Sequence, residues 1–174
     1  MKNISKVIIA AAVVVLGSTS GAFAQASATA SASATIITPI SISKTVDMDF
    51  GNIAVSASTG GTVDLATTGA RTTGGAGGTT LPSTTGTVAA AEFAVSGEAS
   101  FTYAITLPTS ATLSDGSGNT MTVGSFVSNP SATGTLSTGG TQTLLVGATL
   151  TVGAAQVAGT YTNSTGVPVT VNYN

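Results

Sequence analysis

A strict alternation of small apolar and polar residues runs along the early part of the chain. Its even-numbered positions carry Ala26, Ala28, Ala30, Ala32 and Ala34, followed by Ile36, Thr38, Ile40 and Ile42, while the odd positions are mostly Ser or Thr. A period of two residues is typical of an extended strand with one apolar face. An Ala/Ser low-complexity tether is the alternative. Pro39 cannot donate to a strand ladder, so we expect an N-terminal extension over residues 25–38 and a domain over residues 39–174.

Beyond Pro39 the chain alternates between short β-type runs and turns rich in Gly, Asn, Asp or Ser. No segment has a helical stripe, and turn signals recur at the spacing of an all-β sandwich or barrel. Met48 and Phe50 are expected on the core face of one strand. Phe101, Tyr103, Ile105 and Leu107 are expected on that of another. The Gly-rich stretch from Thr72 to Thr80 is expected to be a mobile loop. The predicted strands are Val46–Phe50, Thr62–Thr67, Thr87–Val95, Phe101–Leu107, Thr120–Phe126, Thr141–Val152, Gly159–Thr162 and Val167–Tyr173.

The last predicted strand reaches almost to the final residue of the chain. Val167, Val169, Val171 and Tyr173 alternate with polar residues and proline, which gives the strand one apolar face and a penultimate tyrosine. A sandwich that simply finishes on its last strand is an equally open interpretation of this pattern.

Residues 1–24 have the features of a removable export signal. Lys2 and Lys6 precede an uncharged apolar run from Val7 to Leu16, and Ala22-Phe23-Ala24 forms a small-x-small cleavage site. The apolar run is shorter than the roughly 20 residues that span a bilayer. We therefore expect an exported product, located in the periplasm, at the cell surface or outside the cell, with no transmembrane segment after signal removal.

The amino-acid composition limits the kinds of catalytic and metal sites that the exported protein can form. Cysteine and histidine are absent, which removes disulfides, thiol nucleophiles, Cys/His metal sites and histidine-based triads. After signal removal Lys44 and Arg71 stand against six acidic side chains, a formal charge of −4. This charge argues against a nucleic-acid surface. We expect no enzyme activity, no catalytic residue, no cofactor and no metal site.

Two acidic motifs have spacings that resemble those of functional sites. Asp115, Ser117 and Asn119 have the first ligand spacings of a calcium loop, but Thr120 and Phe126 stand where such a loop needs Gly and Glu. A hairpin turn is the expected role of this segment. Asp47 and Asp49 would share one strand face; we expect a solvated edge there rather than a catalytic carboxylate pair.

Several blocks in a fixed order resemble an exported bacterial family called domain of unknown function 4402. The Ala-Gly-Thr-Tyr block and the terminal tyrosine also resemble chaperone–usher pilins and spore-coat-U-like fimbrial proteins. That second resemblance implies an incomplete immunoglobulin-like antiparallel β-sandwich, completed when the extended N-terminal strand of a neighbouring subunit is added. The blocks are Ala34–Ile42, Met48–Gly51, Val146–Leu150, Ala158–Tyr161 and Val169–Tyr173.

The pilin resemblance assigns roles to both ends of the mature chain. Ala26, Ala28, Ala30, Ala32 and Ala34 would be the donor side chains. Val167, Val169, Val171 and Tyr173 would face a periplasmic chaperone or line the groove edge. The resemblance implies self-assembly, with a chaperone and an outer-membrane usher as partners. We expect a structural subunit of a surface filament; the alternative is a monomeric exported adhesion or carbohydrate-binding module.

Overall fold

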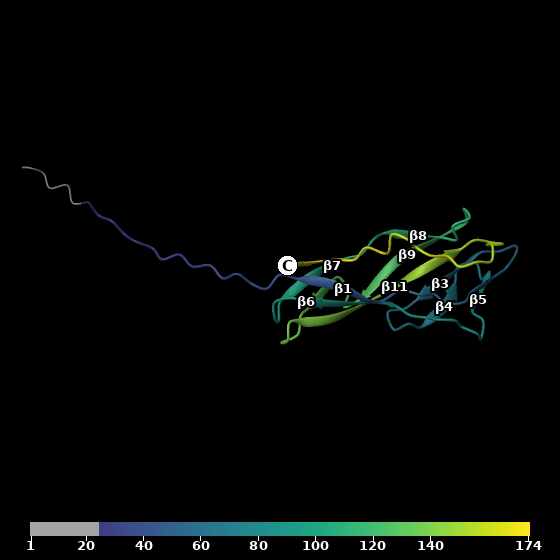
Figure 1. Cartoon of the computed structure of the whole chain (residues 1–174), viewed down its shortest axis with the longest axis horizontal. Helices are drawn as coiled ribbons and strands as arrows, with labels where there is room; N and C mark the ends of the chain where they lie inside the picture. The colour runs from purple at the N-terminus through teal and green to yellow at the C-terminus, as the bar shows by residue number, and fades with distance from the viewer. Residues whose placement is uncertain (1–24) are drawn as a thin grey trace, which may run out of the picture. The chain divides into compact units, whose positions relative to one another are not determined.

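The computed structural model describes residues 25–174, and its regular structure there is entirely β (Figure 1). The predicted export signal, residues 1–24, lies outside the described residues. The chain divides into a unit that ends at Thr35 and a compact unit from Ile36 to Asn174. No helix in the described part is long and apolar enough to cross a membrane. The all-β class expected from the sequence is confirmed.

The larger sheet is antiparallel, curled and built around the long strand β11 (Thr141–Val152). β6 (Ala91–Ser96) pairs with the first half of β11, and β3 (Gly61–Leu65) pairs with the second half. β9 (Thr120–Asn129) pairs along much of β11, so it lies on the side of β11 opposite to β6 and β3. The outer strands are β1 (Ser41–Val46) on β6, β4 (Arg71–Gly74) on β3 and β8 (Ser110–Ser114) on β9.

Two smaller sheets complete the fold. β7 (Thr102–Thr106) lies between β10 (Thr133–Thr135) and β12 (Thr170–Tyr173), and both pairings are antiparallel. β2 (Ala54–Val55) pairs with β5 (Thr79–Thr80). β12 is therefore an edge strand, as is β1 in the larger sheet.

The core follows the even-numbered face of β11. Leu144 and Val146 belong to a first buried cluster, in which the larger sheet meets β7 and β12 through Tyr103 and Val171. The next even-numbered residues of β11 belong to a second cluster, formed by Phe50, Val63, Leu65, Val123, Ala148, Leu150 and Val152. Burial of alternate residues explains why the longest of the predicted strands is the central strand of the sheet.

The structure confirms part of the predicted strand pattern and corrects the rest. β11 has the bounds predicted for it. The predicted strand Val46–Phe50 is wrong, because the residues that pair with β6 are Ser41–Val46. Phe50 is buried and Met48 is half-buried, as expected. Residues 159–162 form only a single bridge, between Thr162 and Ser114, instead of a strand.

The predicted mobile loop from Thr72 to Thr80 is also corrected. Its first residues belong to β4, its last two form β5, and the Thr79 side chain is buried with its hydroxyl donating to the carbonyl oxygen of Thr62 (3.0 Å). Phe101 departs from the expected core face, with 42 % of its surface exposed. Ser100 before it has a φ of +63°, which breaks the alternation just ahead of β7.

Candidate functional site

The predicted donor residues lie in a segment without regular structure. Residues 25–40 contain no strand, and the side chains of Ala26, Ala28, Ala30, Ala32 and Ala34 are exposed. Ile36, the next residue of the same alternation, is 97 % exposed. A donor strand would find its hydrogen-bond partners in a second molecule, so its assignment stays a prediction.

The C-terminal strand shows the burial alternation predicted for it. Val171 is buried, and Val167, Val169 and Tyr173 are half-buried, whereas the residues between them are exposed. The strand itself begins at Thr170 rather than at Val167. Val171 belongs to the first core cluster, and Val169 and Tyr173 pack against it, so this face is occupied within the same chain.

The backbone of β12 has one bonded side and one open side. Asn174 N–H donates to the carbonyl oxygen of Thr102 (3.3 Å), and Asn172 is in register with Ala104. Alternate residues of an antiparallel pair exchange hydrogen bonds, so the even-numbered residues bond to β7. The N–H and C=O groups of Val171 and Tyr173 therefore point away from β7, along the free edge of the sheet.

The hydroxyl of Tyr173 joins the beginning and the end of the compact unit. It donates to the carbonyl oxygen of Thr38 (2.8 Å) and accepts from the N–H of Glu98 (2.5 Å). Thr38 N–H in turn donates to Oε2 of Glu98 (2.9 Å). We call these three residues the terminal clip. Gly97 makes room for it, since a Cβ there would lie 2.2 Å from the Tyr173 hydroxyl oxygen.

The charge of the clip resides on Glu98. The hydrogen bond from Thr38 N–H stabilises the carboxylate and lowers the pKa of Glu98 below its ordinary value. Phe101 packs edge-on against the Tyr173 ring, with the ring centroids 5.7 Å apart. The exposed Phe101 side chain thus covers part of the tyrosine, which explains its place outside the core.

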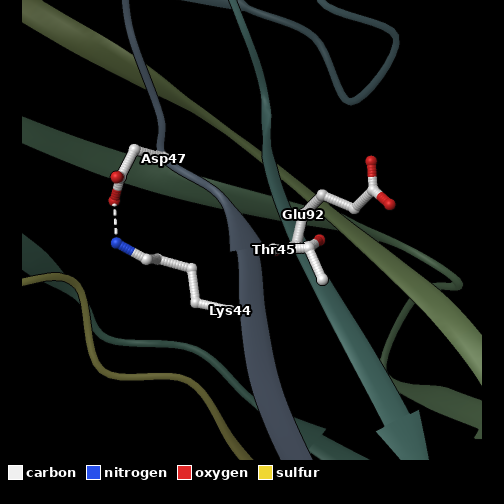
Figure 2. A network of polar contacts seen from close by, with 4 residues as sticks. All are labelled: Lys44, Thr45, Asp47 and Glu92. Atoms are coloured by element: carbon white, nitrogen blue, oxygen red, sulfur yellow. Dashed lines mark hydrogen bonds and ion pairs between the residues drawn. The ribbon is translucent and has the colours of Figure 1, made fainter.

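The free edge of β1 differs from that of β12. Its register shifts between Lys44 and Val46, where the Thr45 hydroxyl donates to the carbonyl oxygen of Glu92 (3.1 Å). Lys44 Nζ forms an exposed ion pair with Asp47 Oδ1 at 2.5 Å (Figure 2). An irregular ladder and charged side chains are common protection against unwanted pairing at sheet edges.

The acidic motifs serve local structure. Asp47 faces Lys44, whereas Asp49 Oδ1 accepts from Gly51 N–H (2.7 Å), so the two carboxylates have separate partners. Asp115 accepts from the N–H groups of Ser117 (2.8 Å) and Asn119 (3.0 Å), which forms the hairpin turn expected between β8 and β9. Within residues 25–174 no group of three or more acidic side chains could hold a metal ion.

One shallow hollow lies on the larger sheet. It measures about 240 Å³ and is lined by Asp64, Thr149, Val127 and neighbouring residues. Small-molecule sites are usually larger, from about 300 Å³ upwards. The Thr149 hydroxyl already donates to Asp64 Oδ1 (2.6 Å), so the hollow offers a ligand few unpaired polar groups.

Comparison with known families adds one finding. The model of a domain of unknown function, DUF4402, matches residues 40–173. The chain belongs to the DUF4402 family. This confirms the family resemblance seen in the sequence blocks. No curated protein and no solved structure matches this DUF4402 chain, so its likeness to pilins stays a prediction.

Sequence reasoning singled out only one member of the terminal clip in this DUF4402 domain. Tyr173 stood out because it ends an alternating strand next to the last residue. Thr38 and Glu98 lie 60 positions apart, in segments with no pattern that connects them. The only local signal of the terminal clip is the pair Gly97-Glu98 in the turn after β6. Glycine at position 97 permits the close approach of another side chain.

Proposed function

We propose that this protein is a structural subunit of a bacterial surface filament, exported and assembled by β-strand addition. Residues 26–34 of one subunit would supply the donor strand to another. The proposal rests on two features that occur together. Residues 26–34 have the alternation of a strand but form no strand, and the sheet of β7, β10 and β12 has an open, uncharged edge at β12. An edge of that kind readily pairs with a second chain.

The proposed architecture is a pilin-like, immunoglobulin-like sandwich. The meeting of the larger sheet with β7 and β12 across the first core cluster supports two facing sheets. β1 and β12 are each paired on one side only, which supports a sandwich that lacks a strand. A periplasmic chaperone that pairs with the C-terminal strand and an outer-membrane usher are the proposed assembly partners.

Backbone hydrogen bonds would contribute at least as much to the free energy of such a subunit contact as the burial of the donor side chains. Burial of five alanine methyl groups at about 0.8 kcal/mol each gives roughly 4 kcal/mol. Ladder hydrogen bonds add about 1 kcal/mol each. The joint would depend strongly on backbone pairing, so a change that interrupts the ladder should be as damaging as the loss of the alanines.

The first experiment compares the full-length protein with a deletion of residues 26–35, both expressed with their export signal. The full chain should give filaments in negative stain and a ladder on gels that collapses on boiling. The deletion should be exported as a monomer. Normal filaments from the deletion would overturn the donor assignment.

A length-matched variant refines the test. Ala30→Pro leaves the length and most methyl groups unchanged but removes one backbone donor and restricts the chain. It should weaken or abolish the ladder, whereas Ala30→Val, which suits a strand, should preserve it. A full-length protein that is monomeric before boiling would favour the exported adhesion or carbohydrate-binding module instead.

A further inference from the structure

We propose that Arg71 is the centre of a binding site for a small ligand that carries a carboxylate. The site is a hollow of about 470 Å³ beside β4, which is within the range of about 300–1,000 Å³ that small-molecule sites occupy. None of its residues belongs to the predicted donor segment or to β12, so this inference is independent of strand addition. The hollow is lined by Gly69, Arg71, Leu81, Pro82, Thr85 and Val88.

One edge of the Arg71 guanidinium is held by the protein itself. Nη1 donates to the carbonyl oxygens of Phe50 and Asn52, the second at 3.1 Å. Phe50 is buried in the second core cluster, so this segment is anchored by packing. The guanidinium is therefore oriented before a ligand arrives, which reduces the entropy cost of binding.

The other edge of the guanidinium is available to a ligand. Arginine has five N–H donors in a planar fork, and the two bonds of Arg71 within residues 25–174 both use Nη1. No buried side-chain nitrogen in this part of the chain lacks a hydrogen-bond partner, so Nε and Nη2 of Arg71 are open to solvent. The Nε–Nη2 edge matches the two oxygens of a carboxylate, with which arginine forms bidentate pairs.

Arg71 has no acidic partner in the part of the chain that the structure describes. The single ion pair there joins Lys44 and Asp47. Residues 25–174 contain two cationic side chains, so Arg71 is the one whose charge is not neutralised by a carboxylate. Arg71 is half-buried, and water screens the attraction of such a group to an anion less than at a fully exposed position.

The acidic residues on neighbouring segments have other partners. Asp49 Oδ1 accepts from Gly51 N–H (2.7 Å). Asp64 lies opposite Thr72 in the pairing of β3 with β4, and both line the hollow of about 240 Å³. Successive residues of a strand point to opposite faces, so Arg71 lies on the face of β4 away from Thr72 and Asp64.

The rest of the hollow is largely apolar and is tied to the segment that holds Arg71. Leu81 and Val88 are half-buried and pack against the second core cluster. Asn52 N–H donates to the carbonyl oxygen of Thr85 (2.7 Å). A ligand with its carboxylate on Arg71 can place a compact carbon skeleton over the apolar side chains, so an acidic sugar and an aromatic acid are the two expected sources of the carboxylate.

Equilibrium dialysis of the exported protein tests the site, because it measures binding whether the protein is monomeric or assembled. The probes are glucuronate, benzoate, glucose and inorganic phosphate. Glucuronate or benzoate should bind, and the tighter of the two identifies an acidic sugar or an aromatic acid as the source. Absence of binding by both, equal binding of glucose, or tighter binding of phosphate would overturn the inference. Binding by a protein that forms no filaments would overturn the proposed function alone.

Two variants of equal charge locate the binding. Thr85→Glu places a carboxylate in the hollow, where it competes for the free edge of Arg71, and it leaves both Nη1 bonds in place. Thr84→Glu adds the same charge at the adjacent exposed position, which does not line the hollow. Thr85→Glu should raise the dissociation constant about tenfold, as expected for the loss of a charge-assisted pair, whereas Thr84→Glu should change it by less than about twofold. Equal effects of the two variants would overturn the assignment to Arg71.

Arg71→Lys separates recognition by the planar fork from attraction by charge alone. Lysine keeps the positive charge but cannot pair with a carboxylate through a fixed fork, so the probe should bind more weakly. Unchanged binding would overturn the role of the fork. Thr85→Glu tests the site even where Arg71→Lys unfolds, because it keeps the bonds from Arg71 to Phe50 and Asn52.

Discussion

The hydroxyl of Tyr173 donates a hydrogen bond to the carbonyl oxygen of Thr38 across 135 positions of sequence. The same oxygen accepts from Glu98 N–H, so one side chain satisfies backbone groups from two distant segments. The terminal clip thereby fixes the point at which the chain enters its first strand.

Removal of this hydroxyl should loosen the clip specifically. Tyr173→Phe keeps the ring and its packing on Phe101 but leaves Thr38 O and Glu98 N–H without their partner. We expect a loss of about 1–2 kcal/mol in the free energy of unfolding, measured by denaturant titration. Amide exchange at Glu98 should accelerate in the folded state. Tyr161→Phe, which removes a hydroxyl bonded to Val157 within its own loop, should leave exchange at Glu98 unchanged.

Substitution of Gly97, which lies against the Tyr173 hydroxyl, should also destabilise the clip. In Gly97→Ala the new Cβ would lie 2.2 Å from the Tyr173 hydroxyl oxygen and 3.1 Å from Leu136, so the tyrosine must move. We expect a destabilisation of about 1–3 kcal/mol. Gly139→Ala is the control, since its nearest neighbour would be the Ser137 hydroxyl at 3.6 Å. Equal stabilities of the two variants would contradict the close approach.

The clip should weaken in acid. Thr38 N–H lowers the pKa of Glu98, so the stabilising contribution is present above the unfolded pKa of about 4.3 and is lost as the pH falls through the lower, folded value. The Glu98 carboxyl signal, followed by NMR, should titrate at a lower pH than that of an unfolded peptide. Glu98→Gln should abolish the acid-induced shift of the Thr38 amide signal. Persistence of that shift in the variant would assign it to another group.

Calcium should leave the protein unchanged. The Asp115 carboxylate is already engaged by Ser117 and Asn119, including the Asn119 side-chain amide at 2.5 Å, and these bonds lower the pKa of Asp115. Millimolar calcium should therefore not shift the Tm measured by thermal unfolding. Asp115→Ala should lower the Tm by removing the turn acceptor. A calcium-dependent rise in the Tm that disappears in Asp115→Ala would restore the metal-site interpretation.

The sequence predicted the parts of the fold in which local alternation and burial coincide. The even-numbered residues of β11 from Leu144 to Val152 are buried, because this face of the strand crosses both core clusters. The predicted strand Val46–Phe50 differs from β1 because the large apolar residues Met48 and Phe50 suggested a strand, although they lie after its end. The side chains of β1 are mostly exposed, so pairing with β6 defines it rather than hydrophobicity.

The candidate site was less accessible to sequence reasoning. Its donor and C-terminal residues follow simple periods of two. The terminal clip depends on three segments that tertiary packing brings together. The difference between the edges of β1 and β12 depends on a register shift in β1 that no single residue predicts. Pairwise geometry of this kind is not encoded in local propensity.

The terminal clip also has a mechanical meaning. Tension applied to the chain ahead of Thr38 would meet the hydrogen bonds to Tyr173 and Glu98 before it reached the first residue of β1. Force would pass into β12, which packs on the first core cluster, and into the turn after β6, instead of peeling an edge strand away residue by residue. A domain anchored in this way is suited to being pulled by its own N-terminal segment.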